Sequence, residues 1–406
     1  MLFITPQAES QTDTLSLRRA IDVAQQNNKT ITISKIGIRA SESRLREVRA
    51  SRLPFLTFST HYLHTPETGY NEIVTDGGQY GVQLTTSLPL YDGGVKSTMV
   101  EQAMNEQERS NVNLKKGSAE VSCNVRISYY SVLGANEELR IREETVGRLE
   151  EYHTFLEQLR LGGNASESDV LKARVDLNNA VIAVDQARQS VQRSKLMLLN
   201  ALGGSFDENI EVVPVTAEDT ASVPSFAIEN NPDIQLLQYD RMSAVHEITI
   251  AKAERLPTLS IAGDVGLLGV KPDEYRDDFG YSILLTLEVP LFNWGSTHNR
   301  IEQKELAWEL LDAQIQLQKR ELETEWRILL TELEVTRKSL LNYAHNITEA
   351  EKNYLAAKSR FAGGNGSNLE VLDAQRLLVE AKLNYNTALF QLRTDLALAL
   401  KLSGQS

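Results

Sequence analysis

Two acidic residues that follow a glycine-rich turn are the side chains whose type and spacing most directly suggest chemistry. Glu370 and Asp373 are three residues apart, a separation that places both carboxylates on one face of a helix. Carboxylates grouped in this way favour cations and oppose anions. The alternative is that both are solvated acids at the start of a helix, where the helix dipole favours negative charge. Both the cation-favouring pair and the solvated helix-terminal acids act through charge alone, so neither interpretation needs a catalytic partner.

Patterns typical of catalysis or cofactor binding are absent from the sequence. There is no Gly-x-Ser-x-Gly nucleophile elbow, no phosphate-binding loop and no dinucleotide fingerprint. Asp92-Gly93-Gly94 resembles a phosphate turn, but no lysine follows at the required spacing. The six histidines and the single cysteine, Cys123, complete no metal pattern, and one cysteine cannot form an intramolecular disulfide. We therefore predict that the protein is not an enzyme and uses no cofactor.

Composition narrows the class of protein further. The 406 residues carry a formal net charge of -13 without a cluster of Lys and Arg, which argues against nucleic-acid binding. Only 23 Gly and 10 Pro interrupt the chain, so long helices are expected. No apolar run reaches the roughly 20 residues of a membrane-spanning helix, although strands could still cross a membrane. Residues 1–14 are interpreted as an N-terminal segment, either the remnant of an export signal or the start of a protein that is not secreted.

The sequence contains an internal repeat. Four matches recur in order at offsets of 201 to 203 residues: Ala24–Asn28 with Ala227–Asn231, Arg52–Leu56 with Arg255–Leu259, Ser87–Gly94 with Glu288–Gly295, and Gly163–Leu171 with Gly364–Leu372. The nearly constant offset and the shared order of the four matches indicate that the two halves are copies. We assign residues 15–206 to the first repeat, 207–225 to an inter-repeat segment and 226–406 to the second repeat. Asp169 then occupies the position that matches Glu370.

Each repeat predicts long helices around one hairpin. In the first, a helix over about 15–51 precedes a hairpin at about 55–90, a long helix to about 161, a tip turn at 162–165 and a helix over about 166–202. The second has a hairpin at about 258–291, a long helix over about 296–361, a tip turn at 363–366 and a helix over about 368–402. The long helix would measure about 105 Å, close to the two shorter helices placed end to end, which predicts a rod.

The hairpin strands alternate with a period of two and are apolar on one face. Phe279, Tyr281 and Ile283 oppose Gly280 and Ser282, for example. At about 10–12 residues, such strands have the length of a tilted strand that crosses a bilayer. The alternative is a helical scaffold or coiled-coil interaction protein, in which the strands would form a small soluble subdomain. Hairpins at equivalent points of both halves argue against that alternative.

These motifs together resemble the TolC-like outer-membrane efflux family, over about Leu15 to Leu402. The resemblance rests on the Leu-Pro before each first strand, the strand exits of the Leu-Pro-Leu-Tyr-Asp-Gly-Gly type, and the glycine turns followed by an acidic residue, Val and Leu. The strand-to-helix turns that carry it contain Pro89, Asp92, Gly93, Gly94, Pro290, Asn293 and Gly295.

The resemblance implies a mainly α fold with β-hairpins, in which long coiled-coil-like helices form a tandem repeat. Each chain would contribute four transmembrane strands to a trimeric, 12-stranded β-barrel in outer-membrane lipid, continued by an α-helical periplasmic tube. Four strands cannot close a barrel alone, so some oligomer is physically required. The implied function is a passive export channel in a Gram-negative type cell. It would receive substrates from a periplasmic adaptor (membrane fusion) protein and an inner-membrane transporter.

The resemblance also assigns roles to the tips. The turn residues Gly162, Gly163, Asn164, Gly363, Gly364 and Asn365 would contact the adaptor. Glycine suits a turn that needs positive φ, and asparagine tolerates it. Glu370, Asp373 and Asp169 would form carboxylate rings at the periplasmic pore constriction.

One departure from the family concerns closure of the pore. The family's best-known member has a Tyr before the second tip and an Arg within it, and these hold the entrance shut. Here Phe361 and Gly366 stand at those positions. Phe cannot donate a hydrogen bond and Gly cannot form a salt bridge, so we predict that closure does not use that linkage.

Overall fold

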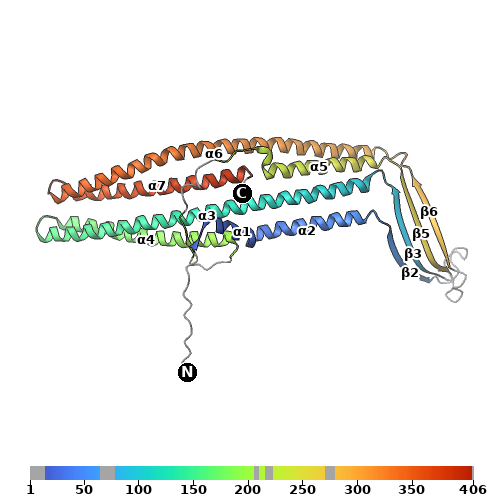
Figure 1. The fold of residues 1–406 in the computed structure, drawn as a ribbon, viewed down its shortest axis with the longest axis horizontal. Coiled ribbons are helices and arrows are strands. Elements are labelled where there is room, and N and C mark those ends of the chain that lie inside the picture. Colours follow the sequence, from blue (N-terminus) through green and yellow to red (C-terminus); the bar gives the residue numbers. More distant parts are fainter. Residues whose placement is uncertain (1–13, 65–77, 205–209, 215–222, 270–278, 405–406) are drawn as a thin grey trace, which may run out of the picture. The chain divides into compact units, whose positions relative to one another are not determined.

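The computed structural model describes residues 14–64, 78–204, 210–214, 223–269 and 279–404 (Figure 1). Two compact units divide it. The first combines residues 1–34, 114–232 and 319–406, and the second combines 35–113 and 233–318. Both units therefore contain segments of both repeats.

The described part of the chain is mainly helical. Its α-helices are α1 (Leu17–Asn27), α2 (Lys29–Ala50), α3 (Val95–Leu161), α4 (Glu167–Leu202), α5 (Pro232–Ala253), α6 (Ser296–Ala362) and α7 (Asn368–Leu402), with a short 3-10 helix η2 (Ile228–Asn230). Helices α3 and α6 have 67 residues each, which corresponds to about 100 Å of α-helix. Among the described helices, none has an apolar stretch long enough to cross a membrane.

The helix predicted over about 15–51 is interrupted, and that prediction is wrong in this detail. Asn28 has an extended backbone, with φ -65° and ψ 132°, and separates α1 from α2. Its side-chain amide donates to the carbonyl oxygen of Ala201 over 2.9 Å, near the C-terminus of α4. Asn231 binds Leu402 in the same way over 3.1 Å. Such hydrogen bonds satisfy carbonyls that a helix end leaves unpaired, and they compete with helix continuation at the asparagine.

One of the apolar clusters in the first unit surrounds Tyr129 of α3. Strand β1 (Thr14–Leu15) pairs in parallel with β4 (Glu211–Val212). The Tyr129 hydroxyl lies 2.8 Å from the carbonyl oxygen of Leu15 and 2.6 Å from that of Val213. Cys123 lies in the same cluster, where burial raises the pKa of its thiol. Parts of the N-terminal segment (1–14) and of the inter-repeat segment (207–225) lie outside the described residues, namely 1–13, 207–209 and 215–222.

The second unit contains a four-stranded antiparallel sheet. Its strands are β2 (Phe55–His64), β3 (Gly78–Tyr91), β5 (Thr258–Gly269) and β6 (Phe279–Glu288), in the order β2-β3-β5-β6 (Figure 1). The hairpin predicted in each repeat is present, and pairing of β3 with β5 joins the two into one sheet. The chain segments between paired strands, 65–77 and 270–278, lie outside the described residues.

The strand register gathers most of the apolar side chains on one face of the four strands, with exceptions on the other face that include Phe55 and Leu284. Phe58 is opposite Leu84, Leu84 is opposite Val265, and Val265 is opposite Tyr281. Cross-strand partners lie on the same face of a sheet, so these four residues form one apolar row. The neighbouring row, Thr57, Thr85, Asp264 and Ser282, is polar and lies on the other face. The alternation predicted from sequence is therefore continued across the whole sheet.

Helices of the second unit are tied together by packing and by polar contacts. Leu45 and Val48 of α2 pack against Val100 and Ala103 of α3. The side-chain amide of Asn105 on α3 donates to the carbonyl oxygen of Tyr239 on α5 over 2.8 Å. Ion pairs add to these contacts: Arg109 with Asp240, and Arg241 of α5 with Asp312 of α6, both at 2.7 Å. These contacts fix the helices from which the strands emerge.

Candidate functional site

Two helix tips in the first unit hold most of the predicted site residues. At tip 1, α3 ends at Leu161 and α4 begins at Glu167, and at tip 2, α6 ends at Ala362 and α7 begins at Asn368 (Figure 1). The two turns are closed by equivalent bonds. The backbone N–H of Asn164 donates to the carbonyl oxygen of Leu159 over 2.8 Å, and that of Asn365 to Arg360 over 2.9 Å.

The second glycine of each turn carries the special backbone conformation. Gly163 and Gly364 both have φ of +76°, and a Cβ added to either would meet nothing within 4 Å. Glycine is therefore required for its backbone freedom and not for lack of space. Asn164 and Asn365 do not have positive φ, so the expected tolerance of asparagine for that conformation plays no part here.

Serine residues cap the helices that leave both tips. Ser166 and Asp169 form a reciprocal capping box at the start of α4. At tip 2 the Ser367 hydroxyl accepts from the backbone N–H of Glu370 over 3.2 Å. Asp169 and Glu370 thus hold equivalent positions in the first turn of a helix, where the dipole favours negative charge.

The Asp169 carboxylate is engaged on two sides. It accepts hydrogen bonds from the Ser166 hydroxyl at 2.6 Å and from the side-chain amide of Asn368 at 3.1 Å. The hydrogen bond from the Ser166 hydroxyl is the largest cause that lowers the pKa of Asp169, and the Asn368 amide adds to it. Asp169 therefore links tip 1 to the start of α7.

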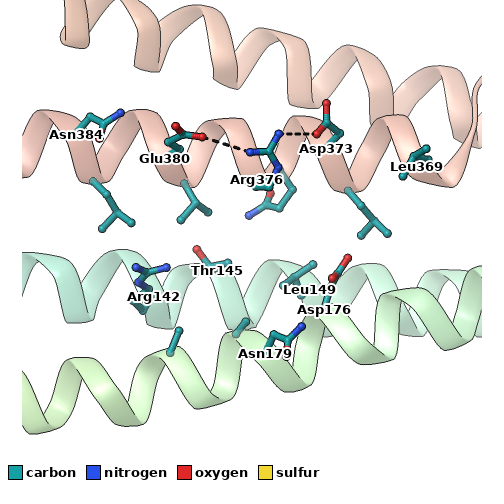
Figure 2. Close-up of a pocket in the computed structure, with 16 residues that line it drawn as sticks. Arg142, Thr145, Leu149, Asp176, Asn179, Leu369, Asp373, Arg376, Glu380 and Asn384 are labelled. Atoms are coloured by element: carbon teal, nitrogen blue, oxygen red, sulfur yellow. Dashed lines mark hydrogen bonds and ion pairs between the residues drawn. The ribbon is translucent and has the colours of Figure 1, made fainter.

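The other two predicted acids are exposed and have arginine partners. Arg360 lies 3.4 Å from Glu370. Arg376 lies 2.8 Å from Asp373 and 3.4 Å from Glu380, and Figure 2 shows both of these ion pairs. Three carboxylates are therefore matched by two guanidinium groups, which leaves one negative charge per chain in this group. The carboxylates are expected from the sequence, whereas these arginine counter-ions are not.

A buried hydrogen-bond network that sequence reasoning missed connects the tips. The Tyr152 hydroxyl on α3 donates to the side-chain oxygen of Asn368 over 2.8 Å, and both side chains are buried. The Asn368 amide in turn donates to the carboxylate and the backbone carbonyl of Asp169, both at 3.1 Å. We call Tyr152, Asn368 and Asp169 the tip network. Their separation of up to 216 residues explains why no local pattern could reveal it.

Phe361 supports the tip network through packing. Its ring centroid lies 6.2 Å from that of Tyr152, at an interplanar angle of 61°. Tyr152 belongs to the apolar cluster that includes Leu156, Val371 and Leu378, and Phe361 packs against that cluster. Edge-to-face aromatic pairs of this kind are favourable beyond their buried area. Phe361 thus makes an apolar contact within the chain. The prediction about closure concerns contacts between chains and stays a prediction.

The strand-to-helix turns, in the second unit, are built alike in both repeats. The Asp92 carboxylate accepts from the backbone N–H groups of Gly94 and Lys96, both at 3.0 Å, and thereby caps α3. Asn293 binds Thr297 at the start of α6, and Trp294 takes φ of +55°. Positive φ occurs at the glycines of both turns, Gly93, Gly94 and Gly295. The prolines lie on the strand side: Pro89 is at a register shift of β3, and Pro290 follows the end of β6. The Asp92 carboxylate therefore has a structural role, because it binds backbone N–H groups of its own turn.

Comparison with known proteins places these features in a family context. A family model described as outer membrane efflux protein matches residues 20–204 and 223–404. The outer membrane protein OprJ of Pseudomonas aeruginosa is 26% identical over 391 residues, which cover 89% of this chain and 78% of OprJ. The solved structure of CusC superposes with a TM-score of 0.89 at 17% identity over 99% of this chain and 96% of CusC. The outer membrane protein VceC of Vibrio cholerae gives 0.82 at 17% identity, over 96% of each chain.

Proposed function

Because the chain belongs to the outer membrane efflux protein family, we propose that it is the passive outer-membrane channel of a tripartite efflux or secretion system. The family is one of channel proteins rather than enzymes, so the energy for export would come from an inner-membrane transporter. A periplasmic adaptor would connect the two. The sequence motifs that resemble this family are consistent with the match over both repeats.

The observation that carries the proposal is the apolar face shared by β2, β3, β5 and β6. Tyr281, Ile283 and Leu285 on β6 are each more than 60% exposed, although their side chains are apolar or aromatic. A water-soluble sheet would cover such a face with another layer. In a bilayer, the face would contact lipid while the polar face lines an aqueous interior.

The edges of the sheet support an oligomer. Within the described residues, β2 and β6 each pair with a strand on one side only. Unpaired strand edges cannot face lipid, because their backbone N–H and C=O groups would lose every hydrogen-bond partner. In our proposal β6 of one copy pairs with β2 of the next, and three copies close a 12-stranded barrel. The helices of the three copies would continue as a periplasmic tube.

A direct test is to fractionate cells and to extract the protein with detergent. We expect the protein in the outer-membrane fraction, and we expect unheated samples to migrate on a denaturing gel as a trimer that heating converts to monomer. A monomer recovered in the soluble fraction would contradict the proposal.

At the tips, we propose that the turns Gly162–Asn164 and Gly363–Asn365 contact the adaptor and that Glu370, Asp373 and Asp169 line the pore constriction. The exposure of Glu370 and Asp373 supports this role. Their arginine partners reduce the field of such a ring, so we expect moderate cation selectivity. Asp169, held in the tip network, would contribute mainly by fixing the geometry of the constriction.

Conductance in planar bilayers tests the constriction. Asp373→Asn should lower the ratio of cation to anion permeability, because it releases Arg376 from one of its two carboxylates and removes a negative charge. The shift in reversal potential under a salt gradient measures this ratio. Asp185→Asn is the matched control, because Asp185 is an exposed acid on α4 that is paired with Arg188 and lies outside the proposed constriction. Equal reversal potentials for both variants would exclude Asp373 from the constriction.

A further inference from the structure

A cavity lies among α3, α4 and α7 of the first unit, close to the tips. Figure 2 shows residues that line it. Its volume is about 540 Å³, which is within the usual range for small-molecule sites. Apolar side chains from all three helices line it, including Leu149, Ala180, Leu372 and Val379. The predicted acid Asp373 lies on its wall, but the groups that matter most for binding are two others.

Gln375 presents an unpartnered amide to this cavity. The side chain is only 4% exposed, and neither its Oε1 nor its Nε2 has a hydrogen-bond partner among the residues that the structure describes. Burial of an amide without hydrogen bonds is costly, and buried polar groups are partnered in the great majority of cases. The side chain offers one acceptor and one donor group. A molecule that carries both a donor and an acceptor would satisfy it.

Asp176 supplies an uncompensated negative charge to the same cavity. The other charged groups on the wall have ion-pair partners: Arg376 binds Asp373 and Glu380, and Arg142 lies 3.4 Å from Glu138. The Nε of Arg142 is buried and has no hydrogen-bond partner among the described residues, so it is a further donor at the wall. Within the described part of the chain, Asp176 has neither an ion-pair partner nor a hydrogen bond. Burial alone raises the pKa of its carboxyl group. In Figure 2 the carboxylate points from α4 into the space that faces α7.

We propose that this cavity binds an amphipathic organic ammonium ion that also carries a hydrogen-bond acceptor. The ammonium group would pair with Asp176 and donate to Gln375 Oε1. The acceptor of the ligand would take the N–H of Gln375 Nε2, and its apolar body would lie against Leu149, Leu372 and Val379. The inference deepens the proposed channel function by naming a cargo class, and it rests on that function for the source of the ligand.

Titration calorimetry on the detergent-extracted full chain tests the site. The probe is propranolol, a protonated aryl amino alcohol that has the required charge, donor, acceptor and ring. Its control is 1-naphthoxyacetate, which keeps the ring but carries a carboxylate. We expect saturable binding of one propranolol per chain and no detectable binding of 1-naphthoxyacetate, because Asp176 would repel it.

Three variants locate the binding site. Asp176→Asn should weaken propranolol binding about tenfold or more, as expected when a charged hydrogen-bond partner is lost. Ala180→Leu should abolish binding, because it fills the apolar part of the cavity without changing any charge. Asp185→Asn removes an acid from the same helix outside the cavity and should bind like wild type. Circular dichroism confirms that each variant is folded.

Three results would overturn the proposal. The first is an Asp176→Asn variant that binds like wild type. The second is equal binding of 1-naphthoxyacetate, and the third is no saturable binding, which would mean that only water fills the cavity. The assay needs neither pump nor membrane, so its failure is separate from failure of the channel function. Binding by a protein that is not in the outer membrane would leave the site intact and refute the channel.

Discussion

Asn368 is the residue on which both halves of the tip network depend. Asn368→Ala removes the acceptor of the buried Tyr152 hydroxyl and the amide that binds Asp169. A buried hydroxyl left without a partner costs about 1–3 kcal/mol, so we expect the free energy of unfolding to fall by that amount. Chemical unfolding in detergent, followed by circular dichroism, measures it. Asn353→Ala, at an exposed position of α6, should change stability little.

A double-mutant cycle separates the hydrogen bond from the packing around it. Tyr152→Phe removes the hydroxyl and leaves the ring against Phe361. In the background of Tyr152→Phe, Asn368→Ala should cost about 1 kcal/mol less than in wild type, because the unsatisfied hydroxyl is then absent. Strictly additive effects would show that the two residues are not coupled.

Asp169 gives the tip network a pH dependence. The pKa of its carboxyl is lowered in the folded chain from the ordinary value of 3.8. A lowered pKa means that the ionised form stabilises the fold above that value, and this stabilisation is lost as the pH falls through the pKa of the folded state. We expect the hydrogen-exchange protection of the first turns of α4 and α7, corrected for the intrinsic exchange rate at each pH, to fall below about pH 4 in wild type. In Asp169→Asn this acid-induced loss of protection should be missing, and its persistence would point to another group.

Among elements, the helices and strands could be predicted because their side-chain periods of 3.6 and 2 are local properties of the sequence. Long-range contacts could not. The interruption at Asn28 depends on Ala201, and the pairing of β3 with β5 depends on strands from different repeats. The same limit applies to the candidate site. Glu370 and Asp373 were recognisable as acids on one face, whereas Arg360 and Tyr152 gain their roles only through tertiary contacts.

The turn at tip 2 tests whether the positive φ of Gly364 matters for stability. Gly364→Ala should lower the free energy of unfolding by about 1 kcal/mol, because alanine at φ of +76° is strained although space is available. Gly363→Ala is the matched control. Its backbone does not have positive φ, and its added Cβ would make only ordinary contacts, at 3.5 Å or more. Unfolding in detergent compares the two, and equal losses would refute a conformational role.

For the whole molecule, the orientation of the sheet in lipid is the property to test. Ile283→Lys places a charge on the apolar face, where a lysine at mid-membrane depth costs about 2–4 kcal/mol. Ser282→Lys places the same charge one residue away on the polar face, beside Asp264. We expect the first variant to reduce the yield of heat-modifiable trimer in the outer membrane and the second to leave it unchanged. Equal yields would contradict lipid contact by this face.

The contacts of Asn28 and Asn231 with the helix ends also bear on how the two repeats could diverge in sequence. Asn28 binds Ala201 and Asn231 binds Leu402, so each joint is closed by residues of one repeat alone. The backbone also fits tightly there, since a Cβ on Gly203 or Gly404 would lie within 3 Å of the carbonyl oxygen of Asn27 or Asn230. A single ancestral copy would already have contained the whole joint. Duplication therefore required no new contact at this place. Each copy could later change the residues of its own tip without disturbing the asparagine contact of the other copy.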